Sequence, residues 1–207
     1  MAYAEAWALQ NTLATARGRD EIPDRLLLVE HPHTYTFGSA VHEENLLLDD
    51  QTLQARGIAV FRTDRGGDIT YHGPGQLVGY LMLDLQRRGG KVREMVHLIE
   101  QAVIDCLAGY GVEAVRKDGA PGVYVDGAKI AALGLRVRNG CSYHGLSLNV
   151  DMDLAPFTII NPCGYSGLKT VQLCHFGVSD SVGQVGENLL AQLERLMPPL
   201  NGGNLAQ

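Results

Sequence analysis

No part of the 207-residue sequence is apolar for long enough to span a membrane. Residues 1–5 also lack the basic and then apolar pattern of a secretory signal peptide, so we expect a cytoplasmic protein without a membrane partner. Positive charge is scarce, because the chain has 17 Lys and Arg but 23 Asp and Glu. The resulting net charge of −6 gives no general reason to expect nucleic-acid binding. Basic residues gather only at Arg87, Arg88, Lys91 and Arg93, where they either form a solvated helix start or meet an acidic partner.

Cysteine is also sparse. Four cysteines, at positions 106, 141, 163 and 174, are too few and too scattered for a disulfide framework, so we expect reduced thiols. No two of them form a Cys-x-x-Cys pair, and the adjacent Cys174 and His175 are poorly placed to supply two ligands from one element. We therefore expect neither a metal site nor a cofactor.

The remaining composition is typical of a globular domain. Hydrophobic residues make up 45% of the chain and charged residues 19%, which argues against disorder. A chain of this length can bury a core of good size as one compact unit, and no repeat or low-complexity linker divides it. We expect a single domain over residues 1–207, with a frayed tail from about residue 200.

Apolar residues recur every three or four positions in several segments, as they do on the buried side of a helix. These segments predict helices over 3–16 and 92–108, a short helix over 49–55, a turn of helix over 152–157, and a last helix capped by Ser179 or Ser181. Apolar runs predict strands at 25–30, 58–63, 76–85 and 112–115.

Two hairpin turns stand out in the second half of the chain. Asp126-Gly127 separates the apolar segments 122–125 and 129–133, and Asn139-Gly140 joins 135–138 to 142–150. The result is an antiparallel meander. Together with the expected helices it predicts an α+β fold with a mixed, mostly antiparallel sheet.

Residues 65–76, Arg-Gly-Gly-Asp-Ile-Thr-Tyr-His-Gly-Pro-Gly-Gln, form the most distinctive stretch. Four glycines and a proline indicate a backbone that turns and admits close approach by a ligand. A polar loop between two apolar strands is a common place for binding residues, and an ordinary surface hairpin is the alternative. Six side chains here are capable of hydrogen bonding: Arg65, Asp68, Thr70, Tyr71, His72 and Gln76. Arg65 either binds a carboxylate or phosphate or anchors its own loop through backbone carbonyls.

Cys163 is the cysteine placed for reaction, because it lies between Pro162 and Gly164 in an expected loop where its sulfur can be reached. Lys129 opens an otherwise apolar strand, and an ammonium near the thiol would favour the thiolate without histidine. A Cys-His pair is also open, with His31, His33, His72 or His144 as the base. Two simpler interpretations are open too: Cys163 is a loop cysteine without a role, and Lys129 is an exposed hairpin lysine.

Several segments of the chain resemble, in order, the lipoyl(octanoyl) transferases of lipoate biosynthesis. The stretch 65–76 resembles the signature of that family. The likeness continues through 118–125, 128–136, 141–150 and 160–165, the last reading Ile-Asn-Pro-Cys-Gly-Tyr, and so covers about residues 26–165. Several matching segments in one order are more specific than a single motif.

The resemblance implies the fold of biotin and lipoate protein ligases. It implies transfer of an octanoyl or lipoyl group from acyl carrier protein to a specific lysine of a lipoyl domain through an acyl-cysteine thioester, the first step of endogenous protein lipoylation. The implied acceptors are the lipoyl domains of 2-oxoacid dehydrogenase complexes and the glycine cleavage H protein. We expect the enzyme to be a monomer.

The resemblance also assigns roles to residues. Cys163 matches the acyl-thioester cysteine, and Lys129 matches the lysine paired with it. At two positions this sequence differs from the usual family pattern: Ala132 stands where serine is often found, and Ser147 where alanine is usual. These differences concern individual contacts with the substrate and not the reaction. The substrate-binding positions carried over are Arg65, Gly66, Gly67, Asp68, Ile69, Thr70, Tyr71, His72, Ala132, Leu133, Gly134, Gly145, Leu146 and Ser147.

Three other functions compete with this interpretation. An ATP-dependent lipoate or biotin ligase on the same fold would leave Cys163 unexplained, and ATP dependence would identify it. A non-enzymatic acyl-chain or carrier-binding module would bind without turnover. A papain-like cysteine hydrolase would have its cysteine near the N-terminus, in a sequence pattern that is not found here.

Overall fold

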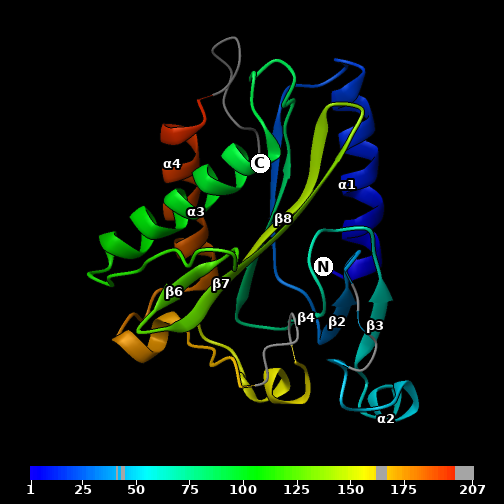
Figure 1. Cartoon of the computed structure of the whole chain (residues 1–207), viewed down its shortest axis with the longest axis vertical. Coiled ribbons are helices and arrows are strands. Elements are labelled where there is room, and N and C mark those ends of the chain that lie inside the picture. The colour runs from blue at the N-terminus through cyan, green and yellow to red at the C-terminus, as the bar shows by residue number, and fades with distance from the viewer. Residues whose placement is uncertain (41, 43–44, 162–166, 199–207) are drawn as a thin grey trace.

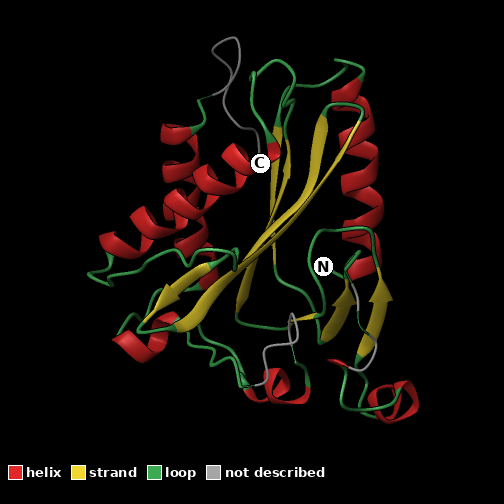
Figure 2. Ribbon diagram, viewed as in Figure 1, coloured by secondary structure: helices red, strands yellow, loops and turns green. Residues whose placement is uncertain are grey.

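The computed structural model of the chain describes residues 1–40, 42, 45–161 and 167–198. Two sheets organise it, a large one of five strands and a small one of three (Figures 1 and 2). The expected loop around residues 161–165 and the expected frayed tail lie, except for Asn161, outside the described residues.

The large sheet is antiparallel throughout. Its order is β1 (Arg25–Val29), β5 (Gln76–Met82), β8 (Cys141–Asn149), β7 (Ala128–Arg138) and β6 (Val123–Val125). Both predicted hairpins are confirmed. Asp126 and Gly127 have φ of 49° and 79°, and Asn139 and Gly140 have φ of 50° and 80°, as a type I′ turn requires at its two central residues.

Helices cover both faces of the large sheet (Figure 1). Helix α1 (Tyr3–Gly18) packs against β5 and β8 on one face, while α3 (Val92–Gly109) and α4 (Val182–Leu196) lie together on the other. Met95, Ile99, Val103 and Leu107 of α3 are buried in the main core, as their spacing predicts. Cys106 joins them as a core residue, and its burial raises the pKa of the thiol to about 11.

The small sheet was only partly predicted. It pairs β2 (Thr34–Phe37) with β3 (Ala59–Arg62) in parallel and with β4 (Thr70–His72) antiparallel. Residues 70–72 belong to the stretch 65–76, which was expected to be a loop, and for them this is wrong; residues 34–37 were not predicted as a strand. Their polar side chains concealed two short strands that are stabilised by pairing with each other across the fold and not by a local pattern. The short helix α2 (Asp50–Ala55) was predicted correctly.

Four further expectations need correction. Residues 112–115 form no strand, and only Val115 makes a bridge, to Tyr124. The apolar spacing that predicts the helix over 3–16 includes Leu9 on its buried face, but Leu9 is 37% exposed and the buried face contains Tyr3, Ala6 and Gln10 instead. The helical turn expected over 152–157 lies slightly later, as the 3-10 helix η2 (Ala155–Ile159); a second, η4 (Leu173–Phe176), was not predicted. The β3 strand is half-exposed at the edge of the small sheet, and so it is not a buried strand.

The architecture is therefore α+β with mixed strand directions, as predicted. Within the ranges described above, no helix is both long and apolar enough to cross a membrane.

Candidate active site

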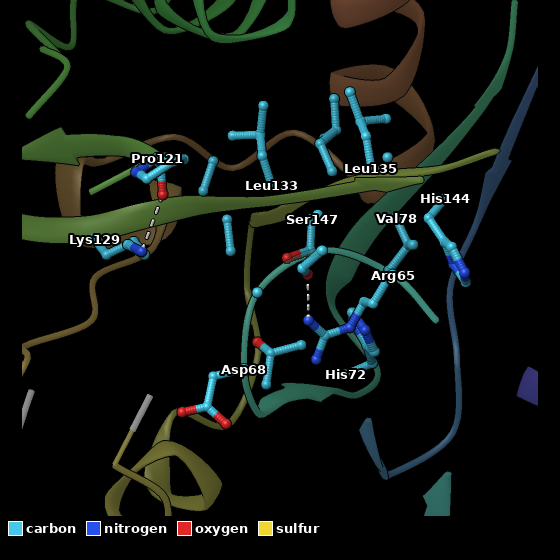
Figure 3. Close-up of a pocket in the computed structure, with 18 of the residues that line it drawn as sticks. Arg65, Asp68, His72, Val78, Pro121, Lys129, Leu133, Leu135, His144 and Ser147 are labelled. Atoms are coloured by element: carbon cyan, nitrogen blue, oxygen red, sulfur yellow. Dashed lines mark hydrogen bonds between the residues drawn. The ribbon is translucent and has the colours of Figure 1, made fainter. Parts of the chain in front are cut away.

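A cavity of about 290 Å³ lies between one face of the large sheet and the glycine-rich stretch 65–76 (Figure 3). Strands β5, β7 and β8 supply the sheet side, and the stretch leading into β4 supplies the other. Most of the residues carried over by resemblance line it: Arg65, Gly66, Gly67, Asp68, Ile69, Thr70, His72, Lys129, Ala132, Leu133, Gly134, Gly145, Leu146 and Ser147.

Arg65 anchors its own loop. Its guanidinium is buried and donates through Nε to Thr36 Oγ1 at 3.0 Å, through Nη1 to Gly66 O at 3.0 Å, and through Nη2 to Thr36 O at 2.5 Å. Of the two roles left open for this arginine, these contacts favour the structural one. A buried guanidinium satisfied by backbone carbonyls holds the stretch against β2.

The glycines of the stretch allow its backbone to lie close to the backbone of β7. Gly66 N donates to Leu135 O of β7 at 3.1 Å, and a Cβ on Gly134 would lie 2.6 Å from Gly66 O. No side chain fits between these two backbones. The glycines therefore set the separation between the stretch and the sheet, and with it the width of the cavity.

Asp68 and Tyr71 make contacts within the protein that the sequence did not indicate. Asp68 lines the cavity, but its carboxylate accepts hydrogen bonds from His42 N at 3.2 Å and from Asn45 Nδ2 at 2.5 Å. Tyr71 does not line the cavity at all. Its ring is buried beside Tyr35 in a second core, and its hydroxyl bonds to His33 Nδ1. Because side chains alternate along β4, Tyr71 points away from the face that Thr70 and His72 present.

Lys129 lies at one end of the cavity (Figure 3). Its Nζ donates to Pro121 O at 3.2 Å and lies 5.2 Å from the centre of the Tyr124 ring. Gly122 makes this placement possible, because its φ is +141° and a Cβ there would come within 3.0 Å of Lys129 Cε. The 118–125 segment thus shapes the space around the ammonium.

The opposite end holds uncharged histidines (Figure 3). Burial lowers the pKa of His72 to about 3 and that of His144 to about 4. His72 Nδ1 donates to Gln76 Oε1 at 2.7 Å, and His144 Nε2 donates to Asp64 Oδ1 at 3.1 Å. An imidazole with so low a pKa is a weak base at neutral pH, so neither histidine suits the activation of a thiol.

Several cavity residues were not identified from the sequence. Tyr3 comes from α1, while Val78 and Tyr80 come from β5; Tyr80 donates to His31 Nε2 at 2.8 Å. Burial raises the pKa of Tyr3 to about 12, so its hydroxyl stays protonated. These residues lie in a helix and in a strand that is buried at every position, where no local motif marks them. Only the packing of α1 against β5 brings them to the cavity.

Cys163 lies outside the described residues, but the residues before and after its segment are placed. Asn161 N donates to Asn45 O at 2.8 Å. After the segment, Lys129 N donates to Lys169 O at 2.8 Å, and Val171 N donates to Lys129 O at 3.0 Å. The chain that follows Cys163 therefore pairs with the backbone of Lys129 itself.

Comparison with known proteins agrees with this geometry. The model of the lipoyl protein ligase A/B catalytic domain matches residues 2–194. The chain belongs to this family. Among its relatives are octanoyltransferases from Azoarcus sp. strain BH72, 64% identical over 95% of this chain and 84% of the relative, and from Aromatoleum aromaticum, 62% identical over 96% and 83%.

Solved structures of the family show the same fold at low identity. A bipartite lipoate protein ligase of Thermoplasma acidophilum is 17% identical, with a TM-score of 0.72 over 91% of this chain and 79% of the other. A lipoate-protein ligase A bound with ATP is also 17% identical, with a TM-score of 0.71 over 91% and 81%. The expected biotin and lipoate protein ligase fold is thus confirmed.

Proposed function

We propose that this chain transfers an octanoyl or lipoyl group from acyl carrier protein to a lysine of a lipoyl domain in two steps, through a thioester on Cys163. That it is an acyltransferase, an octanoyltransferase of lipoate biosynthesis, rests on relatives that are 52–64% identical over most of both chains. The two-step route and the residue roles are the proposal.

In the first step, the Cys163 thiolate attacks the carrier-bound thioester carbonyl. The acyl–sulfur bond to the carrier breaks, a new one forms to Cys163, and the carrier leaves as its thiol after taking a proton from the Lys129 ammonium. Exchange of one thioester for another is nearly balanced in energy, so the step needs no ATP. Lys129 favours the thiolate because its positive charge stabilises the ionised form.

In the second step, the acceptor lysine attacks the acyl-Cys163 carbonyl. The carbonyl–sulfur bond breaks, and the stable amide that forms drives the reaction forward. The attacking amine has to lose a proton, and Lys129 in its neutral form is the base we assign to that task. Cys163 returns as a thiolate beside the Lys129 ammonium, ready for the next cycle.

The observation that carries this proposal is the position of Lys129. Its Nζ lines the cavity, and its backbone is bonded on both sides to residues 169 and 171, a few positions after Cys163 in the sequence. Two of the candidate histidines, His72 and His144, have pKa values that burial lowers to about 3 and about 4; they lie at the other end of the cavity and are uncharged (Figure 3). A lysine-assisted thiolate fits this arrangement better than a Cys-His pair.

The cavity suits a medium acyl chain. Val78, Ala132, Leu133 and Leu146 give it apolar walls. At about 0.8 kcal/mol for each buried methylene, six of them contribute roughly 5 kcal/mol of binding. A chain that is one methylene shorter or longer would be disfavoured by only about tenfold.

For the partners, we propose octanoyl-acyl carrier protein as donor and the lipoyl domains of 2-oxoacid dehydrogenase complexes and the glycine cleavage H protein as acceptors. We also propose that the enzyme acts as a monomer. Sedimentation of the isolated protein tests the last point, since a dimer mass at micromolar concentration would contradict it.

The deciding experiment is intact-protein mass spectrometry after mixing with octanoyl-acyl carrier protein in the absence of ATP. We expect an added octanoyl mass that maps to Cys163 and disappears when a lipoyl domain is supplied. Cys163→Ser should form no such thioester. Transfer at the wild-type rate by C163S, or transfer only when ATP is present, would contradict the two-step route; the second result would favour a ligase.

A further inference from the structure

Two buried asparagines connect the stretch 65–76 to the two flanks of the segment that contains Cys163. We propose that Asn45 and Asn149 are positioning residues for acyl transfer, each holding one flank of that segment in place. The inference rests on the proposed roles of Cys163 and Lys129. We call the chain of contacts Asp68–Asn45–Asn161 the first clamp, and Gln76–Asn149–Val171 the second clamp.

The first clamp holds the chain on the N-terminal side of Cys163. Asn45 Nδ2 donates to Asp68 Oδ2 at 2.5 Å, and Asn45 O accepts from Asn161 N at 2.8 Å. Asn161 is two positions before Cys163. Asp68 is only 4% exposed, and its other oxygen accepts from His42 N at 3.2 Å. A buried carboxylate with both oxygens satisfied has one stable arrangement, so Asn45 is held in a defined position.

The contacts next to the first clamp extend it into a short ladder. Leu46 bridges to Ile160 in antiparallel fashion, and Leu47 N donates to Ile159 O at 3.0 Å. The Asn45–Asn161 bond is thus the rung of this ladder nearest to Cys163 in the sequence. Loss of the Asp68 contact would free the rung that lies closest to the proposed nucleophile.

The second clamp holds the chain on the C-terminal side of Cys163. Gln76 is fully buried, and its Nε2 donates to Asn149 Oδ1 at 3.0 Å. Asn149 Nδ2 donates to Val171 O at 3.0 Å, and Val171 N donates in turn to Lys129 O at 3.0 Å. Asn149 therefore holds the residue that is paired with the backbone of Lys129.

In the second clamp, the side-chain amides of Gln76 and Asn149 each donate one hydrogen bond and accept another. The Gln76 side chain has a fixed orientation, because its Oε1 accepts from His72 Nδ1 at 2.7 Å and its Nε2 donates. The orientation of the Asn149 side chain is then fixed as well, because its Oδ1 accepts from Gln76 and its Nδ2 donates to Val171 O. A displacement of about 1 Å at a reacting group can cost about 100-fold in rate, which is why two such contacts matter for the reaction and not only for folding.

The first clamp is tested by exchanging its two side chains. In Asp68→Asn, the bond to residue 45 persists only if the Asn45 amide turns over so that its Oδ1 accepts from the new Nδ2, so this is the milder change. In Asn45→Asp, two carboxylates face each other. In the double variant D68N/N45D, Asn at 68 can donate to the new carboxylate and still accept from His42 N, so both bonds return. We expect N45D to lower kcat by about 10- to 100-fold, D68N to lower it less, and the double variant to recover most of what N45D loses.

The second clamp is tested with Asn149→Asp, which keeps the shape and the acceptor for Gln76 but loses the donor to Val171 O. Asn11→Asp is the matched control. Asn11 Nδ2 also donates to a backbone carbonyl, Trp7 O at 2.8 Å, but on α1 and outside this cavity. We expect N149D to lower kcat by about 10-fold or more with little change in KM for the carrier, and N11D to leave both unchanged.

A third measurement separates positioning from general loss of structure. The rate of iodoacetamide alkylation of Cys163 is followed against pH in each variant. We expect the midpoint in the native protein to lie below the ordinary thiol pKa of about 8.5, and to move toward that value in N45D and N149D but not in D68N/N45D or N11D. That shift reports the thiol's surroundings and would not follow from a lower melting temperature alone.

The outcomes separate this inference from the proposed function. Wild-type kcat in N149D, or a reduced kcat with an unshifted alkylation profile, overturns the positioning roles while Cys163 keeps its own. Failure of D68N/N45D to recover activity overturns the first clamp. If C163S transfers octanoate at the wild-type rate, the proposed function has failed, whatever the clamp variants do.

Discussion

At the scale of single residues, the site depends on a few glycines as much as on charged groups. Gly122 combines φ of +141° with a backbone so close that a Cβ would lie 2.8 Å from Ala131 O and 3.0 Å from Lys129 Cε. Only glycine satisfies both conditions. Its value to the reaction is therefore indirect, since it leaves room for the ammonium at the end of the cavity.

Gly122→Ala tests this point. We expect octanoyl transfer to slow by about tenfold or more, because the new methyl group has to displace either β7 or the Lys129 side chain. Gly119→Ala is the matched control, since Gly119 also has a positive φ, +73°, but nothing lies within 4 Å of its Cβ position. Steady-state rates of both variants check the prediction. Equal rates in the two would show that backbone conformation, and not the contact with Lys129, accounts for the effect.

At the scale of elements, a group of ion pairs centred on the buried Asp24 connects α1 with the segment between β5 and α3. Arg17 of α1 donates to Asp24 Oδ1 at 2.7 Å, and Arg88 donates to Asp24 Oδ2 at 2.6 Å. Arg87 pairs with Asp20 and Asp84. Two of the four residues in the basic cluster 87–93 thus join α1 to the connection between β5 and α3. They are poor candidates for docking an acidic carrier.

Helix α4 offers a clean test of an element boundary. Ser181 Oγ accepts from Gln184 N at 3.3 Å, and Gln184 Oε1 accepts from Ser181 N at 2.9 Å, which makes a capping box. We expect Ser181→Ala to lower the free energy of unfolding by about 1 kcal/mol, measured by urea denaturation, without loss of octanoyl transfer. Ser179→Ala, two residues outside the box, should be neutral. An equal loss in both variants would contradict the assigned cap.

At the scale of the whole molecule, buried neutral histidines make the fold sensitive to acid. His72 and His144 have pKa values of about 3 and 4 in the folded chain, against about 6.5 when unfolded. Below pH 6.5 the unfolded chain therefore takes up protons that the folded chain does not, so folding weakens as the pH falls toward 4. The pKa of Asp64 is lowered despite its burial, by hydrogen bonds from Tyr143 and His144, so its stabilising contribution is lost only at lower pH.

The expected size is large enough to measure. At pH 5 each histidine lies 1.5 pH units below its unfolded pKa, so the two together lower the free energy of unfolding by roughly 4 kcal/mol relative to pH 7. Urea denaturation at both pH values measures this. His72→Asn, which keeps a donor for Gln76, should remove about half of the difference. A free energy that is the same at pH 7 and pH 5 would contradict the assigned protonation states.

The sequence by itself determined the local features whose causes lie within a few residues. The Asp126-Gly127 and Asn139-Gly140 turns, the apolar stripe of α3 and the presence of α4 all follow from side-chain spacing and backbone preference, while the structure chose Ser181 over Ser179 as the cap of α4. The family, and with it the fold and the octanoyltransferase activity, was also accessible, because several motifs occur in one order along the chain.

Tertiary structure alone decided what depends on contacts between distant segments. Strands β2 and β4 exist because they pair with each other, and Tyr71 is a core residue because the pleat of β4 turns it away from the cavity. Asp68 accepts a hydrogen bond from Asn45, a residue 23 positions away that only folding brings to it. Asn45 and Asn149 carry no local signal, since an asparagine becomes a positioning residue only through the partners that folding brings to it.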